Sequence, residues 1–219
     1  MTTQNSPNAK HHLSNIVVYC GSNFGNDPSF YAAAVATGKA IAERGARLIY
    51  GGGNVGLMGV VADSVLEHDG EAIGIIPKFL KDKEVAHTKL TELVITDCMA
   101  ERKLAMIHRG DAFIALPGGI GTYEELFEVL SLLQLKQHAH PIGVLNINGF
   151  FDPLLAMLKA TTEAGFMPMA NVSLLCVADD IDALLAQMQQ FEFIDSQKWV
   201  KPAWMTDDKI VPSFIDKTD

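Results

Sequence analysis

The chain has 219 residues, 48% of them hydrophobic, which is enough for a substantial core, and we interpret it as a single domain. Its formal net charge of −9 argues against broad binding to nucleic acid or to an anionic membrane, and no apolar run approaches the ~20 residues of a membrane-spanning helix. The three cysteines are widely spaced, without a metal-binding or redox motif, so we expect a protein of the reducing cytoplasm.

Predicted strands and helices alternate along the chain. The polar residues 1–14 lack periodicity and are expected to form a flexible arm. Apolar and β-branched runs predict strands at 16–20, 47–50, 72–76, 93–96, 111–116, 141–146 and 172–177. Helices are expected at 28–44, 99–109, 151–163 and 179–190. Another helix is expected to end at about residue 68, and another to begin after residue 122. This alternation predicts a doubly wound, Rossmann-like α/β fold with a mainly parallel sheet.

The remaining segments are expected to be loops or termini. Residues 78–91 contain four lysines and Glu84 and are expected to form a surface loop near the site. The domain is placed at 15–194, and residues 195–219 are expected to form a tail that packs on the body or on a second subunit.

Three glycine turns follow predicted strands directly, at Gly21-Ser22, at 51–59 and at 117–121. Ligands of doubly wound sheets bind beyond the carboxyl ends of the strands, so these turns are expected to line one pocket. The third turn, PGGIG, also precedes a helix, whose free N–H groups and positive dipole end favour an anion. A phosphate is the natural ligand there.

Glu125 has two interpretations. Thr122 suits the N-cap of the following helix, and Glu125 stands three residues later, which is the spacing of a capping box. However, three glycines in five residues exceed what a cap needs, and a carboxylate beside a phosphate site is repelled unless it has a role there. Both capping and catalysis remain open at this point.

Arg102 and Lys103 are adjacent cations at the start of a predicted helix. The helix dipole disfavours cations at this end, so the pair either meets an anionic ligand or forms salt bridges with Glu101 or another acid nearby.

Other motifs point more weakly to other functions. Gly51, Gly53 and Gly56 fit the spacing of a dinucleotide-binding turn, but no acidic residue ends the next strand, and a P-loop motif is absent. His138 and His140 lack a third ligand at a suitable spacing, so we expect no metal site.

The segment from Met99 to Gly149 resembles the Lonely Guy family of cytokinin riboside 5′-monophosphate phosphoribohydrolases. That family carries PGGxGTxxE, which is matched here from Pro117 to Glu125, and the turns CGS and GGGNVGLMG are also similar. The resemblance covers about residues 15–190. It implies a homodimer that hydrolyses the N-glycosidic bond of an adenine-type nucleotide to free base and ribose 5-phosphate. It implies no cofactor, and nothing in the sequence suggests a pyridoxal phosphate site.

The resemblance also implies roles for individual residues. Arg102 and Glu125 match the catalytic positions. Together with the three glycine turns, the matched positions give a substrate-binding set: Ser22, Gly53, Glu84, Arg102, Lys103, Gly118, Gly119, Ile120, Gly121, Thr122, Tyr123, Glu124, Glu125 and Ser131. Ala100 departs from the family pattern, which has histidine there, and this leaves the preferred base open.

A mechanism follows from the chemistry of the bond. Glu125 is expected to stabilise positive charge on the ribose and to orient or deprotonate water, while Arg102 holds the phosphate or sugar and the carboxylate. For protonation of the leaving base, Glu84 is only a candidate. Two alternatives remain, a nucleotide sensor that binds without cleaving and a dinucleotide-dependent oxidoreductase.

Overall fold

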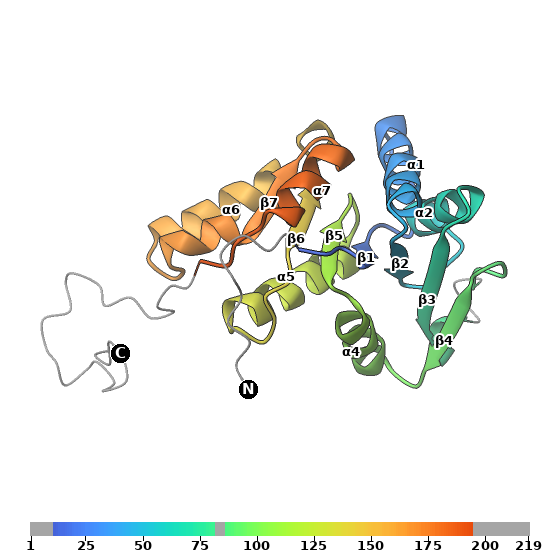
Figure 1. Ribbon diagram of the computed structural model, residues 1–219. Helices are drawn as coiled ribbons and strands as arrows, with labels where there is room; N and C mark the ends of the chain where they lie inside the picture. The colour runs from blue at the N-terminus through green and yellow to red at the C-terminus, as the bar shows by residue number, and fades with distance from the viewer. Residues whose placement is uncertain (1–10, 82–85, 195–219) are drawn as a thin grey trace, which may run out of the picture.

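The computed structural model describes residues 11–81 and 86–194 and contains one sheet of seven parallel strands in the order β4-β3-β2-β1-β5-β6-β7 (Figure 1). The strands are β1 Asn15–Tyr19, β2 Arg47–Tyr50, β3 Glu71–Pro77, β4 Glu92–Thr96, β5 Ala112–Ala115, β6 Ile142–Leu145 and β7 Leu175–Ala178. The central strands β1, β5 and β6 are almost wholly buried, as expected of a parallel sheet covered on both faces. The predicted doubly wound α/β fold is confirmed.

The helices are α1 Pro28–Glu43, α2 Gly56–Glu67, α3 Lys78–Lys81, α4 Met99–Arg109, α5 Ile120–Gln134, α6 Asp152–Glu163 and α7 Ile181–Gln189. Two 3₁₀ segments are η1 Ile147–Gly149 and η2 Met169–Leu174. Figure 1 shows α1 and α2 on one side of the sheet and α4 and α5 on the other. No helix within the described ranges is long and apolar enough to cross a membrane.

The strand order reverses direction at β1. This strand pairs with β2 on one side and with β5 on the other, and α4 carries the chain from the edge strand β4 back to β5. A crevice therefore opens between the carboxyl ends of β1 and β5, where neighbouring connections diverge to opposite faces of the sheet. The first and third glycine turns follow these two strands.

Three details differ from the sequence prediction. Residues 172–174 belong to η2 rather than to β7. The expected loop at 78–91 begins with the short helix α3. His11, assigned to a flexible arm, donates its backbone N–H to the Gln189 carbonyl over 2.9 Å, and Leu13 is buried, so the structured body includes these residues. The tail predicted at 195–219 lies outside the described residues.

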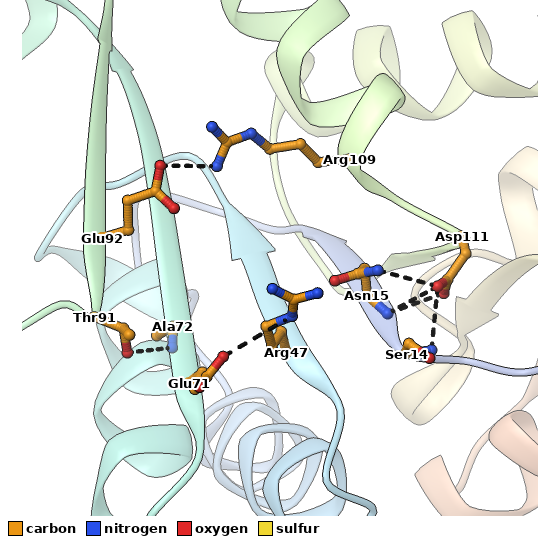
Figure 2. A network of polar contacts seen from close by, with 9 residues as sticks. All are labelled: Ser14, Asn15, Arg47, Glu71, Ala72, Thr91, Glu92, Arg109 and Asp111. Carbon is orange, nitrogen blue, oxygen red and sulfur yellow. Dashed lines mark hydrogen bonds and ion pairs between the residues drawn. The ribbon is translucent and has the colours of Figure 1, made fainter.

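The amino ends of the strands are joined by polar contacts (Figure 2). Asp111 accepts hydrogen bonds from the backbone N–H groups of Ser14 and Asn15 at 3.0 to 3.2 Å. Arg109 pairs with Glu92 at 3.0 Å, and the Ala72 N–H donates to Thr91 Oγ1 at 3.1 Å. These polar groups satisfy one another's hydrogen-bonding capacity at the amino ends of the strands, opposite the glycine turns. They therefore stabilise the fold.

Candidate active site

The three glycine turns meet at the carboxyl edge of the sheet, as predicted. The Gly21 N–H donates to the Pro117 carbonyl over 3.1 Å, and the Met58 N–H donates to the Gly21 carbonyl over 3.3 Å. Gly56 has a φ of +60° and lies directly against the Ser22 backbone, where a Cβ atom would collide with it. Glycine is therefore required there both for backbone conformation and for space.

A cavity of about 250 Å³ lies between the first and third turns. Backbone of both turns forms its rim, and apolar side chains form much of its lining: Phe24, Phe30, Leu57 and Phe150. This combination suits a ligand with a polar part that binds backbone N–H groups and an apolar part that fills the pocket.

Helix α5 begins earlier than the sequence predicted. Its first residue is Ile120 and its N-cap is Gly119, which provides no side-chain cap. Thr122 lies inside the first turn, buried, and its Oγ1 fills the place that a Cβ atom on Gly118 would need. Of the two interpretations of Glu125, the Thr122–Glu125 capping box is wrong, because the N-cap is Gly119, in an extended conformation, and not Thr122. The free N–H groups at this end favour an anion.

Glu125 is a buried carboxyl group on the second turn of α5. It is 9% exposed. Burial raises its pKa from 4.5 to about 7, opposed by the positive charge of Arg102 and increased by the negative charge of Glu124. A buried carboxyl that titrates near neutral pH is a property of functional sites rather than of helix caps.

Arg102 lies on α4 and is 7% exposed. Two backbone carbonyls accept hydrogen bonds from its guanidinium. Its Nε donates to Ile75 O on β3 over 3.1 Å, and one terminal nitrogen, Nη2, donates to Gly51 O over 3.4 Å. A Cβ atom on Gly51 would collide with Nη2, so the second glycine turn makes room for the guanidinium. The Gly51 turn is therefore occupied by an arginine and does not present the open cradle of a dinucleotide site.

Lys103 forms ion pairs with two acids of α5. It contacts Glu124 and lies 3.3 Å from Glu128. These carboxylates raise the pKa of Lys103. Of the two interpretations of the Arg102–Lys103 pair, salt bridging accounts for Lys103, although the acids come from α5 rather than from Glu101. Glu101 instead accepts from the backbone N–H of Asp97 at 3.0 Å.

Only some of the other expected site residues lie at the pocket. Ser22 lines the pocket, Gly53 forms a β-bridge with Ala86, and Ile120 is 88% exposed at the start of α5. Tyr123 packs edge-on against Phe151, with ring centroids 6.2 Å apart. Ser131 is exposed farther along α5. Gly119 and Gly121 have open space around their α-carbons. Glu84 lies outside the described residues.

Tyr19 is a residue that sequence reasoning missed. It ends β1, is 3% exposed, and stacks on Phe113 with ring centroids 6.3 Å apart. Burial and the charge of Glu125 raise the pKa of its hydroxyl well above the usual value. Tyr19 therefore keeps its hydroxyl proton and lies within electrostatic range of Glu125. Its place at the end of a strand before a glycine turn was the available signal.

The described part of the chain contains no group of three or more histidine, cysteine or acidic side chains that could hold a metal ion. The Nε2 atom of His138 lies 3.0 Å from the Val129 carbonyl oxygen, and burial lowers the pKa of this histidine. The rings of His138 and His140 stack with centroids 5.6 Å apart, and both lie against the ring of the buried Phe113, at 5.4 and 6.4 Å.

The chain is similar to several known proteins. The family model described as "possible lysine decarboxylase" matches residues 58–188. A rice protein (Oryza sativa subsp. japonica) named probable cytokinin riboside 5′-monophosphate phosphoribohydrolase LOGL1 is 40% identical, over 86% of this chain and 85% of its own. The Arabidopsis thaliana enzyme LOG7, with the same activity in its name, is 38% identical over 92% of this chain and 93% of its own.

Solved structures share the fold. The molybdenum cofactor carrier protein of Chlamydomonas reinhardtii superposes with a TM-score of 0.61 at 21% identity, over 82% of this chain and 97% of that chain. The molybdenum cofactor binding protein of Rippkaea orientalis gives 0.60 at 21% identity, over 80% and 94%. Identity to the plant proteins is far higher and covers most of both chains. The chain therefore belongs to the family of the cytokinin riboside 5′-monophosphate phosphoribohydrolases, whose model carries the description "possible lysine decarboxylase".

Proposed function

We propose that this protein hydrolyses the N-glycosidic bond of adenine-type nucleoside 5′-monophosphates, giving the free base and ribose 5-phosphate. The observation that carries the proposal is Glu125, a buried carboxyl with a pKa near 7, one turn beyond the N-terminus of α5, which has no side-chain cap. The names of the plant relatives support the same reaction.

Each group has a defined part in the proposed reaction. Breaking the C1′–N9 bond develops positive charge on the ribose, and the ionised Glu125 stabilises that charge and accepts a proton from the attacking water. Arg102 acts through the charge and the planar donors of its guanidinium, by holding the sugar phosphate and by favouring the ionised form of Glu125. The free N–H groups at Gly119 to Thr122 bind the 5′-phosphate, and that binding positions C1′.

One hydroxyl group, that of Tyr19, and one carboxyl group, that of Glu84, are candidates to protonate the leaving base. Tyr19 keeps its proton at neutral pH, and its pKa responds to the charge of Glu125. It is a second candidate, beside Glu84, to protonate the leaving base, although its high pKa makes it a weak acid.

The experiment is direct product detection. Purified protein incubated with AMP should release adenine and ribose 5-phosphate, detected by chromatography. Adenosine should react far more slowly, because it lacks the phosphate that binds the α5 N-terminus. Equal kcat/KM for AMP and adenosine would remove the phosphate site from the proposal. Binding of AMP without any release of adenine would make the protein a nucleotide sensor.

The choice of base is a finer proposal. The pocket beside the third turn is lined by three phenylalanines and a leucine, which suits an apolar substituent on the purine as well as the purine itself. We therefore propose cytokinin riboside 5′-monophosphates alongside AMP as substrates. A comparison of kcat/KM for AMP and isopentenyladenosine monophosphate tests this point, and preference for AMP would limit the activity to that of an AMP nucleosidase.

We also propose that the protein works as a homodimer in the cytoplasm, with no nucleic-acid or membrane partner. Two half-exposed apolar side chains, Leu104 on α4 and Leu135 at the C-cap of α5, support an interface there. The three free thiols, Cys20, Cys98 and Cys176, support a reducing compartment. Cell fractionation tests the location.

A further inference from the structure

His87 is a buried histidine that the proposed mechanism does not use. It is 4% exposed, and its Nε2 lies 3.0 Å from Oδ1 of Asp63 on α2. The backbone N–H of Lys89 donates to its Nδ1 over 3.1 Å. Because Nδ1 accepts a hydrogen bond from an amide, the ring proton of the neutral imidazole is on Nε2 and is donated to Asp63. Both ring nitrogens are therefore in use, and the ring orientation is fixed.

The backbone beside His87 is attached to the second glycine turn. The His87 N–H donates to Gly52 O over 3.1 Å, and Ala86 forms a β-bridge with Gly53. Helix α2 starts at Gly56, just after the same turn, and carries Asp63 two turns farther on. The Asp63–His87 hydrogen bond thus closes a ring of contacts that runs from the turn, along α2, through the imidazole and back to Gly52. This ring braces the second glycine turn from the side of α2.

The braced turn is the one that positions Arg102. Gly51 O accepts from Nη2 of Arg102, and the guanidinium lies so close to Gly51 that no Cβ atom fits between them. A small displacement of the turn would therefore move the guanidinium or its hydrogen bond. The charge of Arg102 is the main favourable influence on the ionised form of Glu125, against burial and the charges of Glu124 and Glu128.

We propose that Asp63 and His87 are positioning residues, which hold the Gly51–Gly53 turn so that Arg102 stays in register with Glu125. The role in turnover rests on the proposed hydrolase function, whereas the effect on Arg102 itself does not. Neither side chain contacts the pocket between the first and third turns, so they act through the arginine.

Two substitutions break the brace and one preserves it. In His87→Asn the amide oxygen can still accept from the Lys89 N–H, but the side chain is too short to reach Asp63. Asp63→Ala removes the acceptor from the other side. Asp63→Asn keeps an oxygen that can accept from Nε2–H, so it is the conservative variant. Arg44→Gln is the matched control, because it breaks the 2.8 Å ion pair with Asp182 that joins α1 to α7.

The first measurement follows Arg102 directly. Its Nε–H, bonded to Ile75 O, should give a protected signal in ¹⁵N NMR, assigned by its loss in Arg102→Lys. His87→Asn and Asp63→Ala should shift this signal and accelerate its hydrogen exchange by about tenfold or more, as expected when a local hydrogen bond opens more often. Asp63→Asn and Arg44→Gln should leave it unchanged. An unchanged Arg102 signal in both disruptive variants would overturn the proposal, whether or not the protein hydrolyses AMP.

The second measurement is turnover of AMP. His87→Asn and Asp63→Ala should lower kcat by about tenfold, the size usual for losing a group that orients a functional residue. The acid limb of their kcat–pH profile should move to higher pH, because a displaced Arg102 stabilises the Glu125 carboxylate less. Circular dichroism verifies that the variants are folded. A disturbed Arg102 signal with unchanged kcat and an unchanged acid limb would also overturn the proposal, and an inactive wild type would refute only the hydrolase function.

Discussion

Glu125 combines two properties that a helix cap does not have. It is the sixth residue of α5, beyond the first turn where caps act, and it is buried with a pKa raised to about 7. A carboxyl that is ionised about half the time at neutral pH can accept a proton during reaction and release it afterwards. Glu125 therefore lowers the free energy of unfolding, and a role in proton transfer explains its presence.

Removing this carboxylate should abolish most turnover. Glu125→Gln keeps the size of the side chain but cannot ionise, so kcat for AMP should fall by about 10²-fold or more while AMP still binds. In the wild type, kcat should rise with pH through about 7 as Glu125 ionises. Steady-state kinetics and calorimetric binding measure these effects. Near-normal turnover of Glu125→Gln would exclude Glu125 as the catalytic carboxylate.

The same substitution should increase stability. The folded pKa of Glu125 is about 7 against 4.5 when unfolded, so between these values the folded state binds more protons and its stability falls as pH rises. At pH 8 the full cost applies, about 3 kcal/mol as an upper bound. Glu125→Gln should therefore melt at a higher temperature than the wild type at pH 8, with a smaller difference at pH 5. A Tm gain that is equal at both pH values would contradict the burial assigned to this carboxyl.

At the scale of elements, the N-terminus of α5 depends on three glycines in different ways. Gly118 is packed against Thr122 and the Gly21 backbone, where a Cβ atom would collide, whereas Gly119 and Gly121 face open space. The structure thus separates a glycine required for packing from two that leave room for a ligand.

Alanine substitutions test this division. Gly118→Ala should lose about 1–3 kcal/mol of stability through overpacking. Gly119→Ala and Gly121→Ala should fold normally but raise KM for AMP, since the added methyl groups occupy the space expected for the phosphate. Thermal melts and AMP kinetics provide the comparison. Unchanged KM in both outer variants would move the phosphate away from this helix end.

Prediction of the elements succeeded where local signals were strong. Helix α4 spans Met99–Arg109 as predicted, and α1 starts after Asp27, which caps Ser29 N at 2.9 Å, with a proline at its first position. The failures lie where apolar sequence has no clear period. Residues 172–174 precede the apolar strand β7 directly, and Val172 has high β-propensity, yet all three form part of a 3₁₀ segment beside α6.

The whole molecule is expected to assemble in pairs. Light scattering at micromolar concentration should give twice the 23.8 kDa mass of one chain. Leu104→Glu, on the exposed side of α4, should shift this equilibrium toward the monomer, whereas Met157→Glu on α6 should leave it unchanged. A monomeric wild-type mass would contradict the proposed homodimer.

The sequence by itself determined the alternation of strands and helices, the parallel sheet and the three glycine turns, because these depend on local periodicity and on the unique backbone freedom of glycine. It also gave Arg102 and Glu125 as the candidate catalytic residues. Only the tertiary structure decided the burial, the hydrogen-bond partners and the electrostatic surroundings of these residues. The carbonyls that hold Arg102 come from residues 27 and 51 positions away, and Lys103 meets acids from another helix. The pKa of Glu125 reflects burial by the assembled layers, which no local pattern contains.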